Sequence, residues 1–136
     1  MKYLFALSFV ILLLSCNNKE EKIDIKLPEL ENLKEYKNGI YTEYYPGRKK
    51  IKIRGAQDKN KVRDGRWVLL SETGNELSVT YFNKGKREGH SIVKYPNGRL
   101  HYVGEYKNNQ MIGVWKFYDE KGKLKEEKDY GTGEVK

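Results

Sequence analysis

Apolar and polar side chains alternate along the chain from about residue 36 onward, and turn signals interrupt the alternation every 11 to 13 residues. The turn signals are Thr73-Gly74, Lys84-Gly85, Asn97-Gly98, Asn108-Asn109 and Lys121-Gly122. The segments between turns have about 6 to 9 residues, which is strand length and too short for a typical helix. No window of 11 or more residues shows the helical period of 3.6. The pattern therefore predicts β-hairpins in series.

The chain also repeats itself at a fixed period of about 24 residues, within the range of about 20 to 50 residues that is typical of repeat arrays. Gly65, Gly89 and Gly113 are equally spaced at this period, and a second glycine follows each of them nine residues later. We therefore expect an all-β fold, an antiparallel meander of successive β-hairpins of about 24 residues each in a single-layer or half-rolled sheet.

The alternation assigns the side chains of each strand to two faces. We predict one apolar, aromatic face and one charged face, as in a meander with one solvated side. The predicted aromatic-face positions are Trp67, Leu69, Leu77, Val79, Tyr81, Leu100, Tyr102, Gly104, Tyr106, Trp115 and Phe117. The intervening positions are mostly charged or polar, with apolar exceptions at Val68, Leu70, Ile92, Val103 and Tyr118.

The repeated residues resemble the MORN repeat, and more closely the MORN-variant repeats of the YwqK-family antitoxins of toxin–antitoxin systems. The likeness covers residues 36–131 and consists of a Gly-x-Trp start, a Tyr-x-x-Gly-like turn, a leucine and a Tyr-Lys-Asn-Gly-like segment. The resemblance implies a hairpin-repeat fold and the neutralisation of a toxin by direct association. The matching residues are Gly65, Trp67, Gly74, Leu77, Phe82, Gly89, Tyr95, Gly98, Leu100, Gly104, Glu105, Tyr106, Gly113, Trp115, Tyr118, Gly122, Leu124 and Tyr130.

Residues 1–15, MKYLFALSFVILLLS, contain one lysine and a continuous apolar run. The run is too short to span a bilayer and has the layout of a secretory signal. Cys16, the only cysteine, follows Leu13-Leu14-Ser15, and this segment resembles the bacterial lipobox. The resemblance implies cleavage before Cys16 and attachment of acyl chains that anchor the protein in a membrane. We predict a lipoprotein signal peptide at residues 1–15; an ordinary signal peptide and an inert thiol are the alternatives.

Residues 16–35 form the predicted lipidated cysteine and tether, and residues 36–133 form the predicted repeat domain. The stretch from Asn17 to Lys26 is charged and poor in apolar residues, which is typical of a linker. Asn17 replaces the aspartate that usually marks retention in the inner membrane, so we expect a lipid anchor in the outer membrane of the cell envelope. Lys19-Glu20-Glu21 resembles a surface-export tag, which adds surface exposure to this expectation.

The chain carries a net charge of +8, or +7 once Lys2 is removed with the signal peptide. A basic protein outside the cytoplasm is attracted to anionic lipid headgroups, phosphate-bearing glycolipids or acidic proteins. The basic residues are interspersed with glutamates, which is typical of a solvated sheet face with protected edges. No block of five like charges occurs, and we expect no nucleic-acid partner.

The sequence offers no set of residues from which a catalytic site can be assembled. His90 and His101 have no cysteine or histidine partner at metal-ligand spacing. Ser71, Ser78 and Ser91 lack the glycine-flanked turn of a nucleophile elbow. No segment resembles a phosphate-cradling loop. We therefore expect no enzyme activity, no metal, no cofactor and no small-molecule substrate.

Eleven tyrosines, four phenylalanines and two tryptophans remain to be explained. In a single-layer meander such rings cover one another across strands, and some of them can instead form a recognition surface. The candidate surface residues are Tyr81, Tyr95, Tyr102, Tyr106, Trp115 and Tyr118. Our hypothesis is a membrane-anchored lipoprotein whose repeats form a non-catalytic platform for an unidentified protein partner, with a toxin as the partner implied by the family resemblance. The alternatives are an envelope lipid- or glycan-binding module and a structural envelope protein.

Overall fold

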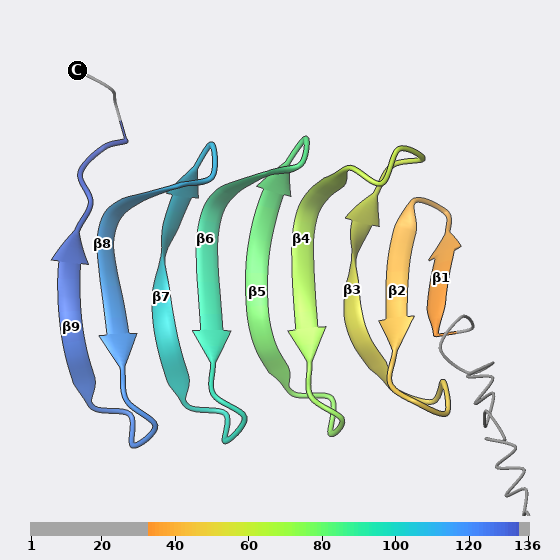
Figure 1. Ribbon diagram of the computed structural model, residues 1–136, viewed down its shortest axis with the longest axis horizontal. Helices are drawn as coiled ribbons and strands as arrows, with labels where there is room; N and C mark the ends of the chain where they lie inside the picture. Colours follow the sequence, from red (N-terminus) through yellow and green to blue (C-terminus); the bar gives the residue numbers. More distant parts are fainter. Residues whose placement is uncertain (1–32, 134–136) are drawn as a thin grey trace, which may run out of the picture.

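The computed structural model describes residues 33–133, so the predicted signal peptide, Cys16 and most of the predicted tether lie outside the described residues. The described residues form one open sheet of nine antiparallel strands that follow one another in sequence order (Figure 1). This confirms the predicted all-β meander of hairpins. The first strand begins at Lys34, two residues before the predicted start of the domain.

The strands are β1 (Lys34–Lys37), β2 (Ile40–Tyr44), β3 (Ile51–Gln57), β4 (Arg63–Leu70), β5 (Glu76–Asn83), β6 (Lys86–Lys94), β7 (Leu100–Lys107), β8 (Gln110–Tyr118) and β9 (Leu124–Asp129). Residues 33–133 include no helix that is long and apolar enough to cross a bilayer. All five predicted turn signals fall in connections between strands.

Short and long connections alternate along the sheet, except that the connection between β3 and β4 is also long, with five residues. Two-residue turns join β1 to β2, β5 to β6 and β7 to β8. Both residues of these turns have positive φ, for example 50° at Asn108 and 70° at Asn109. This is the type I′ geometry, whose twist matches that of the paired strands. The connections at the opposite strand ends are longer, with five residues between β4 and β5, β6 and β7, and β8 and β9.

The repeated glycines mark irregularities in strand pairing. Gly65, Gly89 and Gly113 have φ values of 63°, 88° and 62°. Each lies opposite a position where the pairing register shifts, so that extra residues on β4, β6 and β8 face a shorter segment of the preceding strand. Such β-bulges bend a strand and increase its twist. One period of the sequence repeat therefore corresponds to one bulged hairpin in the structure.

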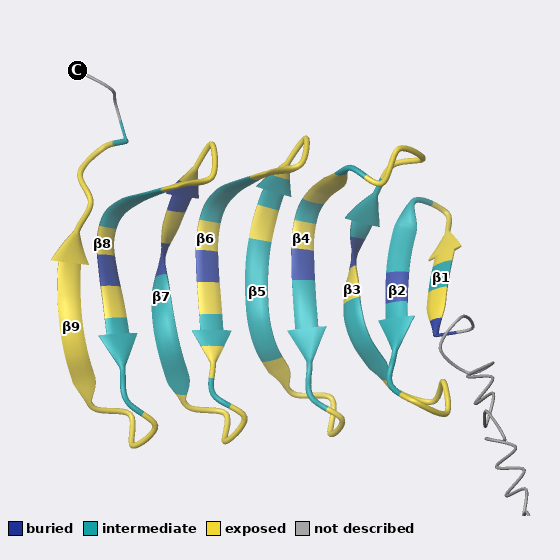
Figure 2. Cartoon of the chain, viewed as in Figure 1, coloured by how far each residue is buried: buried dark blue, intermediate teal, exposed yellow. Residues whose placement is uncertain are grey.

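The hydrophobic core lies on one face of the sheet. Residues directly opposite each other on paired strands share a face, and Tyr41, Gly55, Trp67, Thr80, Ser91 and Gly104 follow one another in register across β2 to β7. We call the side that carries this row and Trp115 the core face, and the opposite side the outer face. Most of the buried positions lie near the middle of β2, β3, β4, β6, β7 and β8 (Figure 2).

Strand β5 corrects the predicted assignment of faces. The prediction placed Leu77, Val79 and Tyr81 on the aromatic face. In the structure Thr80 pairs with Trp67, and Val79 pairs with Val68, so these three side chains lie on the outer face. Alternation shows which residues share a face but not which face that is, and in β5 the core face carries Ser78, Thr80 and Phe82 while the more apolar set lies on the outer face.

Candidate interaction surface

Trp67 lies flat against a glycine of the preceding strand. A Cβ atom added to Gly55 would come within 2.3 Å of the indole ring, so only glycine leaves room for it. The indole Nε1 donates a hydrogen bond to the carbonyl oxygen of Ala56 at 2.9 Å. Tyr41 stacks at 5.7 Å between ring centroids, and Phe82 meets the indole edge-on at 6.2 Å. These contacts leave Trp67 only 4% exposed in a sheet with a single layer.

Trp115 repeats this arrangement two sequence units further along the chain. Its ring would lie 2.2 Å from a Cβ atom on Gly104. Its Nε1 donates to the carbonyl oxygen of Glu105 at 3.2 Å, and Tyr130 meets it edge-on at 6.4 Å. Trp115 is 1% exposed. Two sequence units therefore make one larger repeat, which the sequence analysis did not identify.

The middle unit replaces the tryptophan and the glycine together. Ser91 lies midway in sequence between Trp67 and Trp115, and its partner on the preceding strand is Thr80. The two hydroxyl oxygens are 3.1 Å apart and form a hydrogen bond, and Ser91 is buried. The same position in the repeat is thus filled either by a large ring that packs on a glycine, as at Trp67, or by a pair of small hydroxyl side chains, as at Ser91 and Thr80.

Three of the six predicted surface residues pack against one another on the core face. Tyr106 and Tyr102 lie 4.9 Å and 5.8 Å from Trp115 between ring centroids. Arg87 lies over the Tyr106 ring, with its guanidinium 4.1 Å from the ring centroid. Burial raises the pKa of the Tyr102 hydroxyl. Trp115 and Tyr106 are buried and hold the sheet together, so they offer no contact surface to a partner.

The other three predicted surface residues lie apart from this cluster. The Tyr95 hydroxyl donates to the carbonyl oxygen of Tyr118 at 2.9 Å and so ties one long loop to the end of β8. The Tyr95 ring packs against His101 at 4.2 Å. Tyr81 projects from the outer face and is 40% exposed. The structure therefore does not bring the six aromatic residues together on one exposed surface.

The outer face carries an apolar row that the sequence analysis did not assemble. Four β-branched side chains lie directly opposite one another on four consecutive strands, and we call them the aliphatic ladder: Val68, Val79, Ile92 and Val103. All four are at least partly exposed, and Ile92 is 37% exposed. Three of them are apolar exceptions in the predicted charged face, and only the strand register shows that they are neighbours.

Charged residues surround the aliphatic ladder. Arg66 pairs with Glu76, and this hydrogen bond raises the pKa of the guanidinium. His90 Nδ1 lies 3.0 Å from a carboxylate oxygen of Glu105. In the row of the ladder itself, Arg54 precedes Val68 and is exposed.

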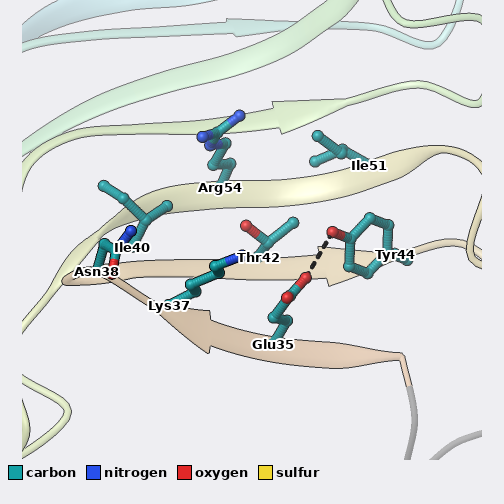
Figure 3. A pocket seen from close by; sticks show the side chains of 8 residues that line it. All are labelled: Glu35, Lys37, Asn38, Ile40, Thr42, Tyr44, Ile51 and Arg54. Carbon is teal, nitrogen blue, oxygen red and sulfur yellow. Dashed lines mark hydrogen bonds between the residues drawn. The ribbon is translucent and has the colours of Figure 1, made fainter.

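The same row ends in a hollow between β1, β2 and β3, with a volume of about 350 Å³ (Figure 3). Glu35, Thr42 and Arg54 follow one another in register along it. The Tyr44 hydroxyl donates to the Glu35 carboxylate at 2.8 Å, and this bond raises the pKa of Tyr44. The carboxylate is thus engaged by a structural hydrogen bond.

Within residues 33–133, no group of three or more His, Cys, Asp and Glu side chains is arranged to hold a metal ion. Comparison of the chain with protein-family models, with curated proteins and with solved structures finds no match. The functional proposal therefore rests on the two faces of the sheet.

Proposed function

We propose that this protein is a non-catalytic binding module that docks a partner protein on its outer face. The observation that carries the proposal is the aliphatic ladder, because four apolar side chains in register form a continuous strip within a charged face. An exposed apolar strip with a polar rim is typical of interaction surfaces. Burial of such a strip contributes roughly 25 cal/mol per Å² of apolar surface.

Packing on the core face holds the strands that carry the aliphatic ladder in fixed positions. Trp67 and Trp115 are fixed by glycine contacts and by indole hydrogen bonds, which set the positions of β3, β4, β7 and β8. A surface that is already rigid loses little conformational entropy when a partner binds. The sheet therefore presents the aliphatic ladder in a fixed geometry.

The charges around the ladder favour an acidic partner. Arg54 and Lys94 flank it, and their side chains form no hydrogen bond or ion pair among the described residues. Such charges accelerate association with an oppositely charged surface and select against basic partners. The best fit is a protein with an apolar strip bordered by carboxylates.

The proposed setting is the cell envelope, with the sheet tethered to the outer membrane through a lipidated Cys16. Support for this part comes from the sequence, in the lipobox-like segment Leu13–Cys16 and the polar stretch that follows. The resemblance to the YwqK-family antitoxins extends the proposal to an antitoxin-like or immunity-like role, in which the partner is a toxin that acts at the envelope.

Site-specific photo-cross-linking of the full chain in cells tests the docking surface. A photo-reactive residue at Ile92 should give one protein adduct, because this position lies in the middle of the ladder. The same residue at Lys125, an exposed position on β9, is the matched control and should give no such adduct. Equal adducts from both positions, or none from Ile92, would refute docking on the ladder.

A second experiment tests the antitoxin-like role. Expression of the cross-linked partner should arrest growth in cells that lack this chain, and co-expression of the chain should restore growth. Restoration should fail for Val79→Lys/Ile92→Lys and persist for Lys121→Ala/Lys125→Ala. If the partner is harmless when expressed alone, the antitoxin-like role is wrong and only the binding function of this protein remains.

A further inference from the structure

A cleft of about 530 Å³ opens at the β1 end of the core face, away from the aliphatic ladder. Its floor is aromatic, because Tyr36 and Tyr41 lie opposite each other on β1 and β2. Tyr36 is 51% exposed, and Tyr41 stacks on Trp67, which also lines the cleft. The cleft therefore offers flat ring surface that is open to solvent.

The connection between β3 and β4 forms the wall of this cleft. It has five residues, whereas the other turns at the same strand ends have two. The Asp58 carboxylate oxygen Oδ1 accepts hydrogen bonds from the backbone N–H groups of Asn60 and Val62, both at 2.8 Å. The additional residues thus form an ordered loop, and they place Lys59 and Lys61 on the wall of the cleft.

Basic groups outnumber acidic groups in the lining of the cleft, with Lys34, Lys59, Lys61 and Arg63 against Glu35 and Asp58. Lys59 and Lys61 form no hydrogen bond or ion pair through their ammonium groups among the described residues. Lys34 lies opposite Glu43 and attracts its carboxylate, and the Arg63 guanidinium lies 4.2 Å from the centroid of the Trp67 ring. Asp58 is engaged by its own loop, and Glu35 accepts a hydrogen bond from Tyr44. The cleft therefore combines the free ammonium groups of Lys59 and Lys61 with the exposed ring of Tyr36 and the partly exposed ring of Tyr41.

We propose that this cleft binds an acidic polysaccharide, a chain of sugar rings that carry carboxylates. The apolar C–H faces of a sugar ring pack on the rings of Tyr36 and Tyr41, since tyrosine supplies rigid amphipathic contact area. The carboxylate pairs with the ammonium groups of Lys34 and Lys59 in charge-assisted hydrogen bonds. The choice of a glycan over other anionic chains rests on the envelope location proposed above.

Isothermal titration calorimetry of the full chain with trigalacturonate tests the proposal, in a polyoxyethylene detergent so that no detergent sugar competes. Trigalacturonate should bind, and neutral maltotriose should not. The variant Lys34→Gln/Lys59→Gln should weaken binding by about tenfold. The matched control Lys121→Gln/Lys125→Gln removes the same charge at the opposite end of the sheet and should stay within about twofold.

A tyrosine pair tests the aromatic floor. Tyr36→Ala should weaken binding of trigalacturonate by about tenfold, while Tyr81→Ala on the outer face should leave it unchanged. Thermal unfolding shows whether each variant keeps its fold. If Tyr36→Ala does not, Tyr36→Leu is measured in its place.

Three results would overturn the proposal: no heat of binding at about 10 mM trigalacturonate, equal weakening by the two lysine pairs, or hexaglutamate or oligothymidine binding as tightly as trigalacturonate. The last result would show that the cleft takes an acidic peptide or a single-stranded nucleic acid. Photo-cross-linking from Ile92 tests docking of a protein on the outer face, and calorimetry tests glycan binding in the cleft. Either proposal can therefore fail while the other stands.

Discussion

At the scale of single residues, the side chains at positions 67, 91 and 115 are matched in size to the residue that each faces on the preceding strand. Trp67 and Trp115 need glycine opposite them, because a Cβ atom there would overlap the indole ring. Ser91 occupies the equivalent position and faces Thr80 instead. A change on one strand is therefore tolerated only with a matching change on its neighbour.

We predict strong coupling between positions 80 and 91. Ser91→Trp alone should destabilise the protein by about 1 to 3 kcal/mol, because the ring meets Thr80 in a filled site. Adding Thr80→Gly should recover most of this loss by recreating the arrangement at Trp67. The free energies of unfolding of the two single variants and the double variant, measured in urea, give the coupling. Additive changes in the free energy of unfolding would contradict the interpretation that the pair at positions 80 and 91 is equivalent to Gly55 and Trp67.

A second prediction at this scale concerns pH and Glu43. Burial is the largest single influence and opposes ionisation, but hydrogen bonds from Lys52 at 3.1 Å and Tyr41 at 3.0 Å, with attraction to nearby lysines, outweigh it and lower the pKa of Glu43. A lowered pKa stabilises the folded protein above the unfolded-state pKa of about 4.3, and this contribution is lost as the pH falls through the folded-state value.

The difference in unfolding free energy between the wild-type protein and Glu43→Gln should therefore shrink as the pH falls from about 6 to about 3. Urea titrations at several pH values measure it. Glu72→Gln makes the same substitution in an exposed loop and is the matched control. A difference that stays constant with pH would mean that Glu43 contributes through packing alone.

At the scale of elements, the turns determine how the strands meet. The two-residue turns need positive φ at both positions, and Lys84 meets this demand with φ of 47° although it is neither glycine nor asparagine. Side chains other than glycine, asparagine and aspartate adopt this conformation at a steric cost. The hairpin of β5 and β6 therefore carries local strain that its counterpart at Asn108-Asn109 avoids.

Lys84→Asn should stabilise the protein by about 0.5 to 1 kcal/mol, since asparagine tolerates positive φ and the backbone N–H of residue 84 keeps its bond to Asp64. Lys86→Asn is the matched control, because it removes the same charge from a strand position. Chemical denaturation compares the two variants, and equal stabilities would show that the turn at Lys84 is not strained.

At the scale of the whole molecule, the sheet is a one-dimensional array. The extensive contacts of each strand are with the strands before and after it in sequence. In such an array the stability of a strand depends on its neighbours, and the end strands have only one. All six residues of β9 are exposed, and β1 has only four residues.

Amide hydrogen exchange should therefore be slowest in β4 to β8 and faster toward both ends of the sheet, with local opening of β1 and β9 before global unfolding. Exchange measured by mass spectrometry on the full chain resolves the gradient. Equal protection of β9 and β6 would show that the sheet unfolds as a single unit.

The sequence by itself determined the features that depend on neighbouring residues along the chain. Turn positions such as Asn108-Asn109 were predictable because positive φ restricts which residues fit, and the strand class followed from the spacing between turns. The antiparallel meander followed from the regular period of the glycines. These are local constraints, and the structure confirms them.

Only the tertiary structure decided which residues meet across strands. Val68, Ile92 and Val103 appear in the sequence as isolated exceptions, and the register makes them, with Val79, a continuous strip. The cleft at Tyr36 depends in the same way on the connection between β3 and β4, which lines it together with residues of β1. Register is set by bulges and by contacts between residues far apart in the chain, and a shift of one residue exchanges the two faces of a strand.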